Sequence, residues 1–393
     1  MSKKHNIFVI WGWFPPFIGG GSARGYRLFN ALSERGHSVT VFTTMHPGSK
    51  THNRISSTFN IISIPPSLIY PSKTGRYSRV MDSATSTIRY INLYILLTYF
   101  CLRQKPDTII KEATTWVYSL PSLYKYIKFD GFHTASSIAP WVLIKTISHV
   151  PLFVYFTGLW KRPQRHYLDY AYSADKIIVV DKWMINALKD KGVENEFLFL
   201  PVCVDTNVFQ PSHDPPNDTV LFVGRLEQGK GCDVLIKAAP AIIRKVPGCR
   251  IKIVGTGNEA QALQMLAGKL NIMANTIFTG EINPHRVEEM YKGAKVMVNP
   301  LRLPGISNVT IEAMACGVPV VKSIIDGYDC YPIQDGHNGY LFKVDDYSDL
   351  ADKVVKTLQN PHWSLLSQAA RETSMQFDIK ASVDKLEQII NIF

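Results

Sequence analysis

The sequence has few of the features that mark a disulfide framework, a zinc site or a membrane span. Its six cysteines are scattered through 393 residues, and no two of them form a C-x-x-C pair. This spacing excludes a recognisable zinc site or disulfide framework and favours a reducing cytoplasmic compartment. The most apolar stretch, residues 90–102, is shorter than the ~20 residues that a helix needs to cross a bilayer. We therefore expect a core helix there and no transmembrane segment.

Negative charge is scarce in the first half of the chain. Residues 1–200 contain 24 Lys and Arg against 11 Asp and Glu, a net charge of +13, whereas residues 201–393 carry −2. Such one-sided charge favours an anionic partner, such as acidic lipid headgroups, a diphosphate or nucleic acid. The alternative is that this positive charge serves only the solubility of the protein. The basic half lacks Arg and aromatic residues interleaved on a recognisable module, which argues against nucleic acid.

Repeats of 20–50 residues are also missing. Both halves instead alternate short β-branched runs with helical patterns, which is typical of parallel α/β layers. In the first half the sequence predicts strands at 7–11, 38–43, 107–111, 151–157 and 175–181, and a helix at 22–36. In the second half it predicts strands at 220–224, 250–255, 276–280, 295–300 and 318–322, and helices at 232–246, 259–270 and 285–293.

These patterns predict two doubly wound domains in series. Residues 1–200 form the first domain, a proline-rich hinge covers 201–218, and residues 219–375 form the second. A final helix at about 376–393 has an apolar seam that must dock on another element, and we expect it to pack back on the first domain. Ligands of such sheets bind beyond the carboxyl ends of the strands. The loops that follow strands are therefore the candidate functional loops.

The first candidate loop, residues 15–21, ends in Gly19, Gly20 and Gly21 before a helix. Three glycines let backbone amides approach a ligand, and the helix N-terminus behind them attracts anions. A dinucleotide fingerprint is weak, because G-x-G-x-x-G and an acid after the second strand are both missing. A flexible turn is the alternative.

The second candidate loop, residues 223–231, carries two cations, Arg225 and Lys230, after Gly224. A guanidinium and an ammonium beside a helix N-terminus suit a diphosphate, although solvated surface charge is an equally simple explanation. Further strand-end glycines could let the main chain approach a base edge; they are Gly255, Gly257 and Gly280.

The third candidate is the stretch "LPGISNVTIEAMACGVPVV", residues 303–321. Gly305 allows a sharp entry into a helix that Ser307 or Asn308 can cap, so that amides and the positive end of the dipole can receive phosphate. Glu312 lies about one turn further on, where its carboxylate could accept hydrogen bonds from two ribose hydroxyls. An acid placed favourably near a helix N-terminus is the alternative.

Together and in this order, the motifs resemble the retaining glycosyltransferases of family 4, which have the GT-B fold of two Rossmann-like domains facing across a cleft. The resemblance covers essentially the whole chain and is strongest after residue 200. It is carried by "PPFIGGG", "VCVDTNVFQP", "VGRLEQGKGCDVLIKAA", "VGTGNE", "IFTGEI", "EEMYKGAKVMVNPL", "GISNVTIEAMACGVPVV" and "DGHNGYLF".

The resemblance implies a hexosyltransferase-type enzyme that uses a UDP-, GDP- or ADP-sugar and a glycan or lipid-linked acceptor of the cell envelope. Arg225 and Lys230 would hold the diphosphate and stabilise the leaving group, and Glu312 would bind ribose. Further donor contacts would come from Gly19 to Gly21 and from Gly305, Ile306, Ser307, Asn308 and Val309. No cofactor or bound metal is expected, which agrees with the missing D-x-D motif. We expect a cytoplasmic protein with peripheral contact at the inner, anionic face of the membrane.

The chain departs from the family pattern at three places, one of which is the hinge, where Val202-Cys203 stands in place of the usual Asn-Gly. Pro304 stands where the first acid of the E-x7-E motif is expected, although front-face attack with proton transfer to the leaving phosphate can make that acid dispensable. Thr157 lies where a family histidine often stands, and His133 is a candidate substitute or a structural histidine. Because of Pro304, a GT-B protein that binds a sugar nucleotide without transferring it is the alternative function.

Overall fold

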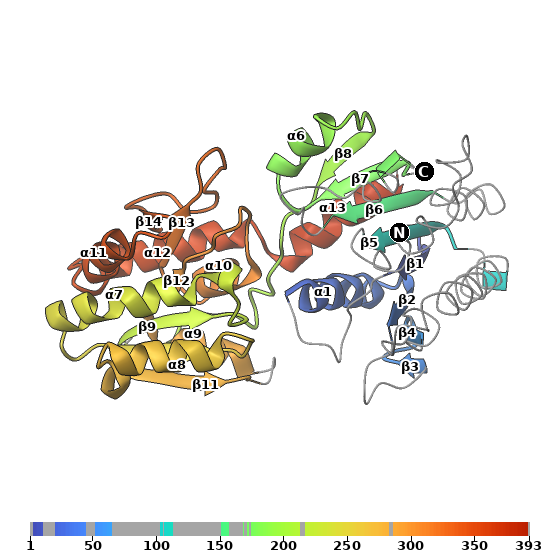
Figure 1. The fold of residues 1–393 in the computed structure, drawn as a ribbon. Helices are drawn as coiled ribbons and strands as arrows, with labels where there is room; N and C mark the ends of the chain where they lie inside the picture. The colour runs from blue at the N-terminus through green and yellow to red at the C-terminus, as the bar shows by residue number, and fades with distance from the viewer. Residues whose placement is uncertain are drawn as a thin grey trace, which may run out of the picture. The chain divides into compact units, whose positions relative to one another are not determined.

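The computed structural model describes residues 3–10, 20–44, 52–64, 103–104, 106–112, 151–156, 168, 171–172, 174–212, 217–282 and 286–391. The chain divides into two compact units, Met1–Pro201 with Ser382–Phe393, and Val202–Ala381 (Figure 1). Both units are α/β. Within the described residues, no helix is both long and apolar enough to cross a membrane.

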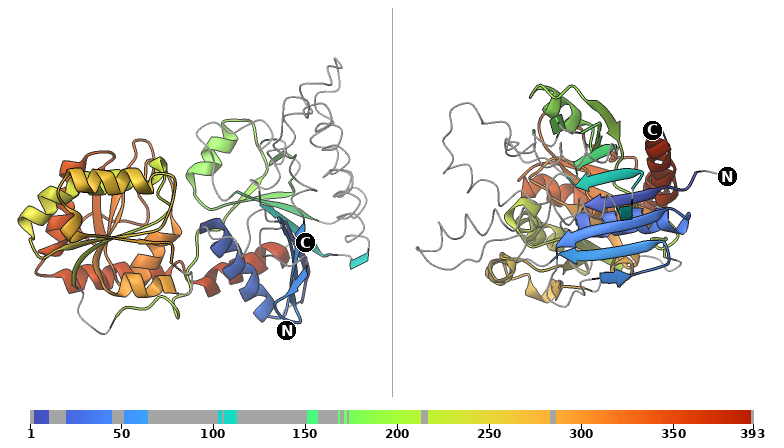
Figure 2. Two further views of the ribbon diagram at one scale, coloured as in Figure 1. Left: turned by 60° about the horizontal axis from the view of Figure 1, so that its bottom comes forward. Right: turned by 90° about the vertical axis from the view of Figure 1, so that its right-hand side faces the viewer.

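The described residues of the first unit form an eight-stranded sheet in the order β3-β4-β2-β1-β5-β6-β7-β8. All neighbouring strands are parallel except β3 and β4 (Figure 2, right). The strands are β1 (Asn6–Ile10), β2 (Ser38–Thr44), β3 (His52–Arg54), β4 (Phe59–Ile64), β5 (Thr108–Glu112), β6 (Leu152–Phe156), β7 (Lys176–Val179) and β8 (Glu196–Phe199). Helices α1 (Gly20–Glu34) and α6 (Trp183–Lys189) belong to the same unit.

The strand predicted at 7–11 is confirmed as β1, shifted by one residue and central in the sheet. Ile7, Phe8 and Val9 are at most 1% exposed, as expected for a strand buried on both faces. The sequence did not predict β3, β4 or β8. β3 and β8 are edge strands, and edge strands carry less of the apolar pattern on which such predictions depend.

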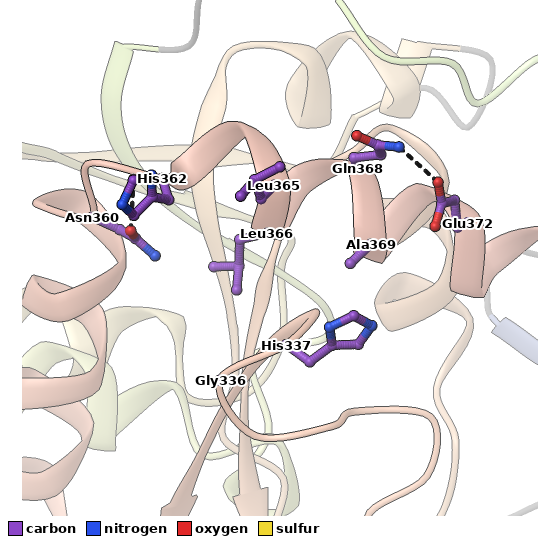
Figure 3. Close-up of a pocket in the computed structure, with 9 residues that line it drawn as sticks. All are labelled: Gly336, His337, Asn360, His362, Leu365, Leu366, Gln368, Ala369 and Glu372. Atoms are coloured by element: carbon purple, nitrogen blue, oxygen red, sulfur yellow. Dashed lines mark hydrogen bonds between the residues drawn. The ribbon is translucent and has the colours of Figure 1, made fainter.

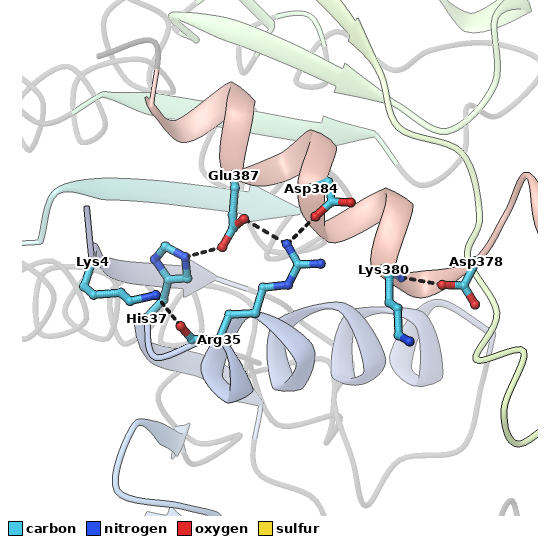
Figure 4. Close-up of polar contacts among 7 residues, drawn as sticks. All are labelled: Lys4, Arg35, His37, Asp378, Lys380, Asp384 and Glu387. Atoms are coloured by element: carbon cyan, nitrogen blue, oxygen red, sulfur yellow. Dashed lines mark hydrogen bonds and ion pairs between the residues drawn. The ribbon is translucent and has the colours of Figure 1, made fainter. Parts of the chain in front are cut away.

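The last helix, α13 (Ile379–Asn391), begins in the second unit and from Ser382 onward belongs to the first. Its apolar seam is buried, with Val383 and Leu386 at most 1% exposed. On its polar side, Glu387 accepts a hydrogen bond from Nε2 of His37 at 2.8 Å and pairs with Arg35 at 2.9 Å (Figure 4). Because Nδ1 of His37 accepts from the backbone N–H of His5, the imidazole proton is assigned to Nε2.

The second unit contains a six-stranded parallel sheet in the order β11-β10-β9-β12-β13-β14. Its strands are β9 (Asn217–Val223), β10 (Arg250–Val254), β11 (Thr276–Gly280), β12 (Ala294–Asn299), β13 (Val320–Ile324) and β14 (Gly339–Lys343). Successive side chains of β9 alternate between two apolar clusters, Val220 and Phe222 in one and Leu221 in the other. This alternation is the period of two expected of a strand.

Helices cover both faces of this sheet (Figure 2, left). One cluster contains side chains of α7 (Cys232–Lys245), α8 (Ala260–Lys269) and α11 (Tyr347–Leu358). The other contains side chains of α9 (Val287–Lys292), α10 (Asn308–Ala315) and α12 (Trp363–Met375). The predicted fold class, two doubly wound parallel α/β sheets, is thus confirmed.

The segment predicted as a hinge, 201–218, is for the most part not a free linker. Val202, Val204 and Phe209 are buried in the second unit's core. Arg371 of α12 donates hydrogen bonds to the carbonyls of Thr206 and Phe209, and β9 already begins at Asn217. The prolines of this segment predict irregular backbone, but they do not show whether that backbone packs on a core.

Candidate functional site

The sheet of the second unit has its topological switch point between β9 and β12. The chain passes from β9 through β10 to β11 on one side, and from β12 through β13 to β14 on the other. The loops after β9 and β12 therefore leave neighbouring strand ends in opposite directions, which is where ligands of doubly wound sheets bind. These are the loops that carry Arg225, Lys230 and the entry to α10.

Backbone layers pack closely at these strand ends. Gly255 has φ +133°, and a Cβ there would lie 1.9 Å from the carbonyl oxygen of Gly224, so only glycine fits. At Gly257 a Cβ would lie 2.3 Å from the carbonyl oxygen of Leu226. The N–H of Gly255 also donates to the carbonyl of Gly280 at 2.9 Å. The structure thus brings together the four strand-end glycines that the sequence singled out.

Lys230 ends a short 3-10 turn, Gln228–Lys230, and is followed by Gly231 in the left-handed conformation. Its side chain is half-buried. Burial, followed by the charge of Arg225, lowers the pKa of Lys230 below its ordinary value, and Glu227 opposes this shift. No described residue forms a hydrogen bond or ion pair with its ammonium group. An anionic ligand would offset both the cost of burying the ammonium and its repulsion by Arg225.

Arg225 lies on the same loop with a side chain that is 64% exposed. Its guanidinium pairs with Glu227 at 2.7 Å. Exposed ion pairs of this kind contribute only about 0–1 kcal/mol. A phosphate group could therefore compete with Glu227 for this guanidinium.

The entry to α10 differs from the predicted capping. Ser307 occupies the N-cap position, but its side chain makes no capping hydrogen bond, and Asn308 is already the first helical residue. The Ser307 hydroxyl instead lies 2.9 Å from Thr310 Oγ1 and accepts from Nδ2 of Asn299 at 2.9 Å. The amide of Asn299 at the end of β12 thus fixes the first turn of α10 in place of a side-chain cap.

The remaining residues predicted at this entry lie close by. Gly305 has φ +124°, in the left-handed region that favours glycine. Ile306 and Val309 are half-buried and pack against the apolar cluster of α9 and α10. Pro304, in the position of the missing acid, is half-buried in the irregular segment between β12 and α10.

Glu312 lies in the second turn of α10 and is only 5% exposed. Its Oε2 accepts a hydrogen bond of 3.0 Å from the hydroxyl of Tyr291, which is fully buried on α9. Sequence reasoning missed Tyr291. The signal that could have identified it is a tyrosine at an apolar helix position. A buried phenol needs a hydrogen-bond partner, so such a tyrosine indicates a polar group nearby. The ribose role of Glu312 stays a prediction.

Other predicted site residues lie elsewhere. Gly20 and Gly21 form the first turn of α1 in the first unit. Gly19, His133 and Thr157 lie outside the described residues. Across the part of the chain that the structure describes, no three His, Cys, Asp or Glu are grouped as metal ligands; the expected independence from metal stays a prediction.

An open pocket of about 550 Å³ lies beside the loop that leads into β14, the strand at one edge of the second sheet (Figure 3). Gly336 and His337, which precede β14, form one side, and residues of α12 form another. Among the described residues that line it are two histidines and Glu372, but no Lys or Arg. This pocket therefore lacks the positive charge that a diphosphate requires.

Two family models match consecutive parts of the chain. The model described as Glycosyltransferase Family 4 matches residues 18–208, and the model described as Glycosyl transferases group 1 matches residues 204–375. Together they span both units.

Curated relatives match over part of their length. An uncharacterized glycosyltransferase of Haemophilus influenzae is 29% identical over 180 residues, 44% of this chain and 49% of the relative. The D-inositol 3-phosphate glycosyltransferase of Frankia alni is 31% identical over 179 residues, 41% of this chain and 44% of the relative. The chain thus spans about half the length of the curated relatives that it matches.

Solved structures match over nearly the whole chain. Sucrose-phosphate synthase from Thermosynechococcus elongatus has a TM-score of 0.77 at 19% identity, covering 99% of this chain and 98% of the other. Anabaena HepE in complex with UDP and glucose has a TM-score of 0.72 at 14% identity, covering 99% and 100%. At these identities the likeness shows the shared GT-B fold.

Proposed function

The chain belongs to the glycosyltransferases of family 4, and from this premise we propose that it transfers a sugar from a nucleotide-diphosphate sugar to an acceptor with retention of configuration. The observation that carries the proposal is Lys230. Its half-buried ammonium has no partner among the described residues, has a lowered pKa, and lies at the switch point beside Arg225. Fixed positive charge at that place suits a departing nucleoside diphosphate.

In the proposed reaction the bond between the sugar C1 and the diphosphate oxygen breaks while a bond from the acceptor oxygen to C1 forms on the same face. The acceptor proton passes to an oxygen of the leaving phosphate, so the missing carboxylate at Pro304 is not required. Arg225 and Lys230 take up the charge that develops on the diphosphate, and the positive end of α10 adds to their effect.

The rest of the donor would extend from the diphosphate along the loops of the second unit. The buried pair of Glu312 and Tyr291 is assigned to the ribose hydroxyls, and the backbone of Gly255, Gly257 and Gly280 to the base edge. The base itself is left open among uracil, guanine and adenine, since it would be contacted largely by backbone.

The acceptor is proposed to be a glycan or a lipid-linked molecule of the cell envelope. One relative, from Mycolicibacterium smegmatis, is named a GDP-mannose-dependent phosphatidylinositol monomannoside mannosyltransferase, and another is a D-inositol 3-phosphate glycosyltransferase. The charge of +13 on residues 1–200 is consistent with a lipid-diphosphate acceptor or peripheral contact with an anionic membrane. Liposome sedimentation without a preference for acidic lipids would count against membrane contact.

The donor assignment is tested by titrating UDP-, GDP- and ADP-sugars and following thermal stability, since a ligand of the folded state raises the melting temperature. Turnover of the stabilising sugar nucleotide is then measured in Arg225→Ala and Lys230→Ala. Each variant is expected to lose about 10²-fold or more, as observed when a donor to a developing anion is removed. Lys269→Ala, at the far end of α8, is the charge-matched control. Wild-type kinetics in both variants would rule out the proposed roles.

The second candidate function is a GT-B protein that binds a sugar nucleotide without transferring it. Pro304 is the observation that favours it, because the first acid of the E-x7-E motif is missing. Stabilisation by a sugar nucleotide with neither hydrolysis nor transfer, across a panel of glycan and lipid-linked acceptors, would support this function over the first.

A further inference from the structure

Arg302, in the segment that follows β12, connects three loops of the second unit. Its Nε pairs with Asp345 at 2.6 Å, in the turn between β14 and α11. Its terminal nitrogens bind Asp233, in the first turn of α7, at 2.9 Å. One of them also donates to the carbonyl of Gln228 at 2.6 Å, and the backbone N–H of Arg302 donates to the carbonyl of Gly229 at 3.0 Å.

These contacts hold the turn that carries Lys230. The turn has three residues, Gln228–Lys230, and Arg302 binds the carbonyls of two of them. The side chain of Leu303, the next residue, lies close enough that a Cβ on Gly229 would be 3.6 Å from its Cδ1. Arg302 and Leu303 therefore restrain the turn by polar and apolar contacts together.

The charge of Arg302 is compensated, unlike that of Lys230. The pKa of Arg302 is raised, chiefly by its hydrogen bond to Asp233. Burial lowers this pKa, but the hydrogen bond to Asp345 adds to the increase. Burial alone would raise the pKa of Asp233, but hydrogen bonds from Arg302 and Lys237 hold it below its ordinary value. A guanidinium between two carboxylates attracts an incoming diphosphate weakly, so Arg302 is poorly suited to bind the ligand itself.

We propose that Arg302 is a positioning residue: it holds the Gln228–Lys230 turn so that the Lys230 ammonium stays half-buried at the switch point, ready to receive a diphosphate. An unrestrained turn would let this ammonium move into water, where a lysine is more stable. Because the cation is already held in place, binding of the ligand does not have to bring it back from water and order it. The identity of the ligand as a diphosphate rests on the proposed function, whereas the restraint of Lys230 by Arg302 does not.

The first test needs no ligand. Hydrogen exchange of the amides of residues 228–231 and the pKa of Lys230, followed by NMR through its Cε resonance, are compared between wild type and Arg302→Ala. We expect exchange in the turn to accelerate by about tenfold or more and the pKa of Lys230 to rise toward its ordinary 10.5. The charged groups around the turn, which share in this titration, are Arg225, Glu227, Asp233, Lys237 and Asp345.

Two milder variants keep the test decisive if Arg302→Ala does not fold. Arg302→Lys keeps the charge but loses the guanidinium fork, so it should resemble the alanine variant and not the wild type. Asp345→Asn keeps a side chain of the same size and should give an intermediate effect. Lys245→Ala, which breaks the ion pair with Asp352 between α7 and α11, is the control and should leave the turn unchanged.

The second test uses inorganic pyrophosphate and UDP as probes. Arg302→Ala and Arg302→Lys are expected to weaken binding of both ligands by about tenfold. This is the effect of losing the favourable contact between the displaced Lys230 ammonium and the diphosphate. Unchanged exchange and an unchanged Lys230 pKa in both variants would overturn the positioning role. If those two quantities change as expected but neither wild type nor Lys230→Ala binds pyrophosphate, the proposed function fails and the positioning role stands.

Discussion

Gly231 lies against the carbonyl oxygen of Pro300 so closely that a Cβ at this position would be 1.9 Å from that oxygen. The backbone of Gly231 is also left-handed, with φ +69°. The loops after β9 and β12 therefore meet at a point where a side chain has no room, directly beside Lys230.

Gly231→Ala is expected to lower the free energy of unfolding by about 2 kcal/mol or more, because strained backbone and a main-chain clash act together. UDP affinity should fall as well, since the alanine displaces the turn that carries Lys230. Denaturant unfolding and UDP titration measure the two effects. Gly248→Ala is the matched control, because a Cβ at Gly248 meets nothing within 4 Å; equal behaviour of the two variants would contradict the close contact.

UDP affinity is expected to fall as pH rises through the pKa of Lys230, which burial and Arg225 place below the ordinary 10.5. A diphosphate stabilises the ammonium, so the pKa of Lys230 is higher in the complex than in the free protein. Binding therefore takes up a proton in the window between the two values and is favoured on its acidic side. Calorimetry in two buffers of different ionisation enthalpy measures the proton uptake. Lys230→Met should abolish the uptake in this window; if uptake persists in that variant, another group is responsible.

Tyr291→Phe is expected to destabilise the protein by about 1–3 kcal/mol, because it removes a hydrogen bond to the buried carboxylate of Glu312. If Glu312 receives the ribose, the variant should weaken UDP binding more than pyrophosphate binding. Tyr340→Phe is the control, since the Tyr340 ring is also buried and its hydroxyl has no hydrogen-bond partner in the described part of the chain. Equal weakening of the two ligands would argue against the ribose role.

The central strands of both sheets were predictable because they are apolar on both faces. β9 and β12 are such strands, and each contributes to both apolar clusters of its unit. β14 was missed at the sheet edge, where Gly339 and Lys343 bound a short apolar run. α11 was missed although its signals were present. Asp346 is its N-cap and accepts hydrogen bonds from the backbone N–H groups of Ser348 and Asp349, and apolar residues recur at helical spacing.

The positions of Arg225 and Lys230 followed from the sequence because a loop after a strand can be recognised locally. Arg302 could not be identified in this way. Its partners Asp233 and Asp345 lie 69 and 43 residues away, and nothing in the local pattern indicates which carboxylates a surface arginine will meet. The pairing of Tyr291 with Glu312 depends in the same way on how α9 and α10 pack.

Pro304→Glu restores the first acid of the E-x7-E motif and is expected to retain or raise the rate of sugar transfer. Pro304 lies next to Gly305, whose φ of +124° sets the entry to α10, so loss of the proline ring can itself alter the segment. Pro304→Gln is the matched control, with the same side-chain length and no charge. Initial rates of all three proteins separate the effects: loss of activity in both variants would show that proline shapes the site.

Glu387→Gln is expected to weaken the attachment of α13 to the first unit. Burial alone would raise the pKa of Glu387, but hydrogen bonds from His37 and Arg35 outweigh it and hold the pKa below its ordinary 4.5. A carboxyl whose pKa is depressed by folding contributes stability above its unfolded pKa and loses that contribution as pH falls through the folded pKa. Near neutral pH the variant should therefore lose about 1.5–3 kcal/mol, the value of a hydrogen bond to a charged group.

The difference between Glu387→Gln and wild type should shrink as pH falls below 4.5, because the wild-type carboxyl then takes up a proton and loses the same ionic contacts. Urea unfolding across this pH range measures it. Asp384→Asn is the control, since the side chain of Asp384 also pairs with Arg35 but is 60% exposed and such pairs contribute little. A difference between Glu387→Gln and wild type that stays constant from neutral to acid pH would show that the Glu387 carboxylate adds nothing through its charge.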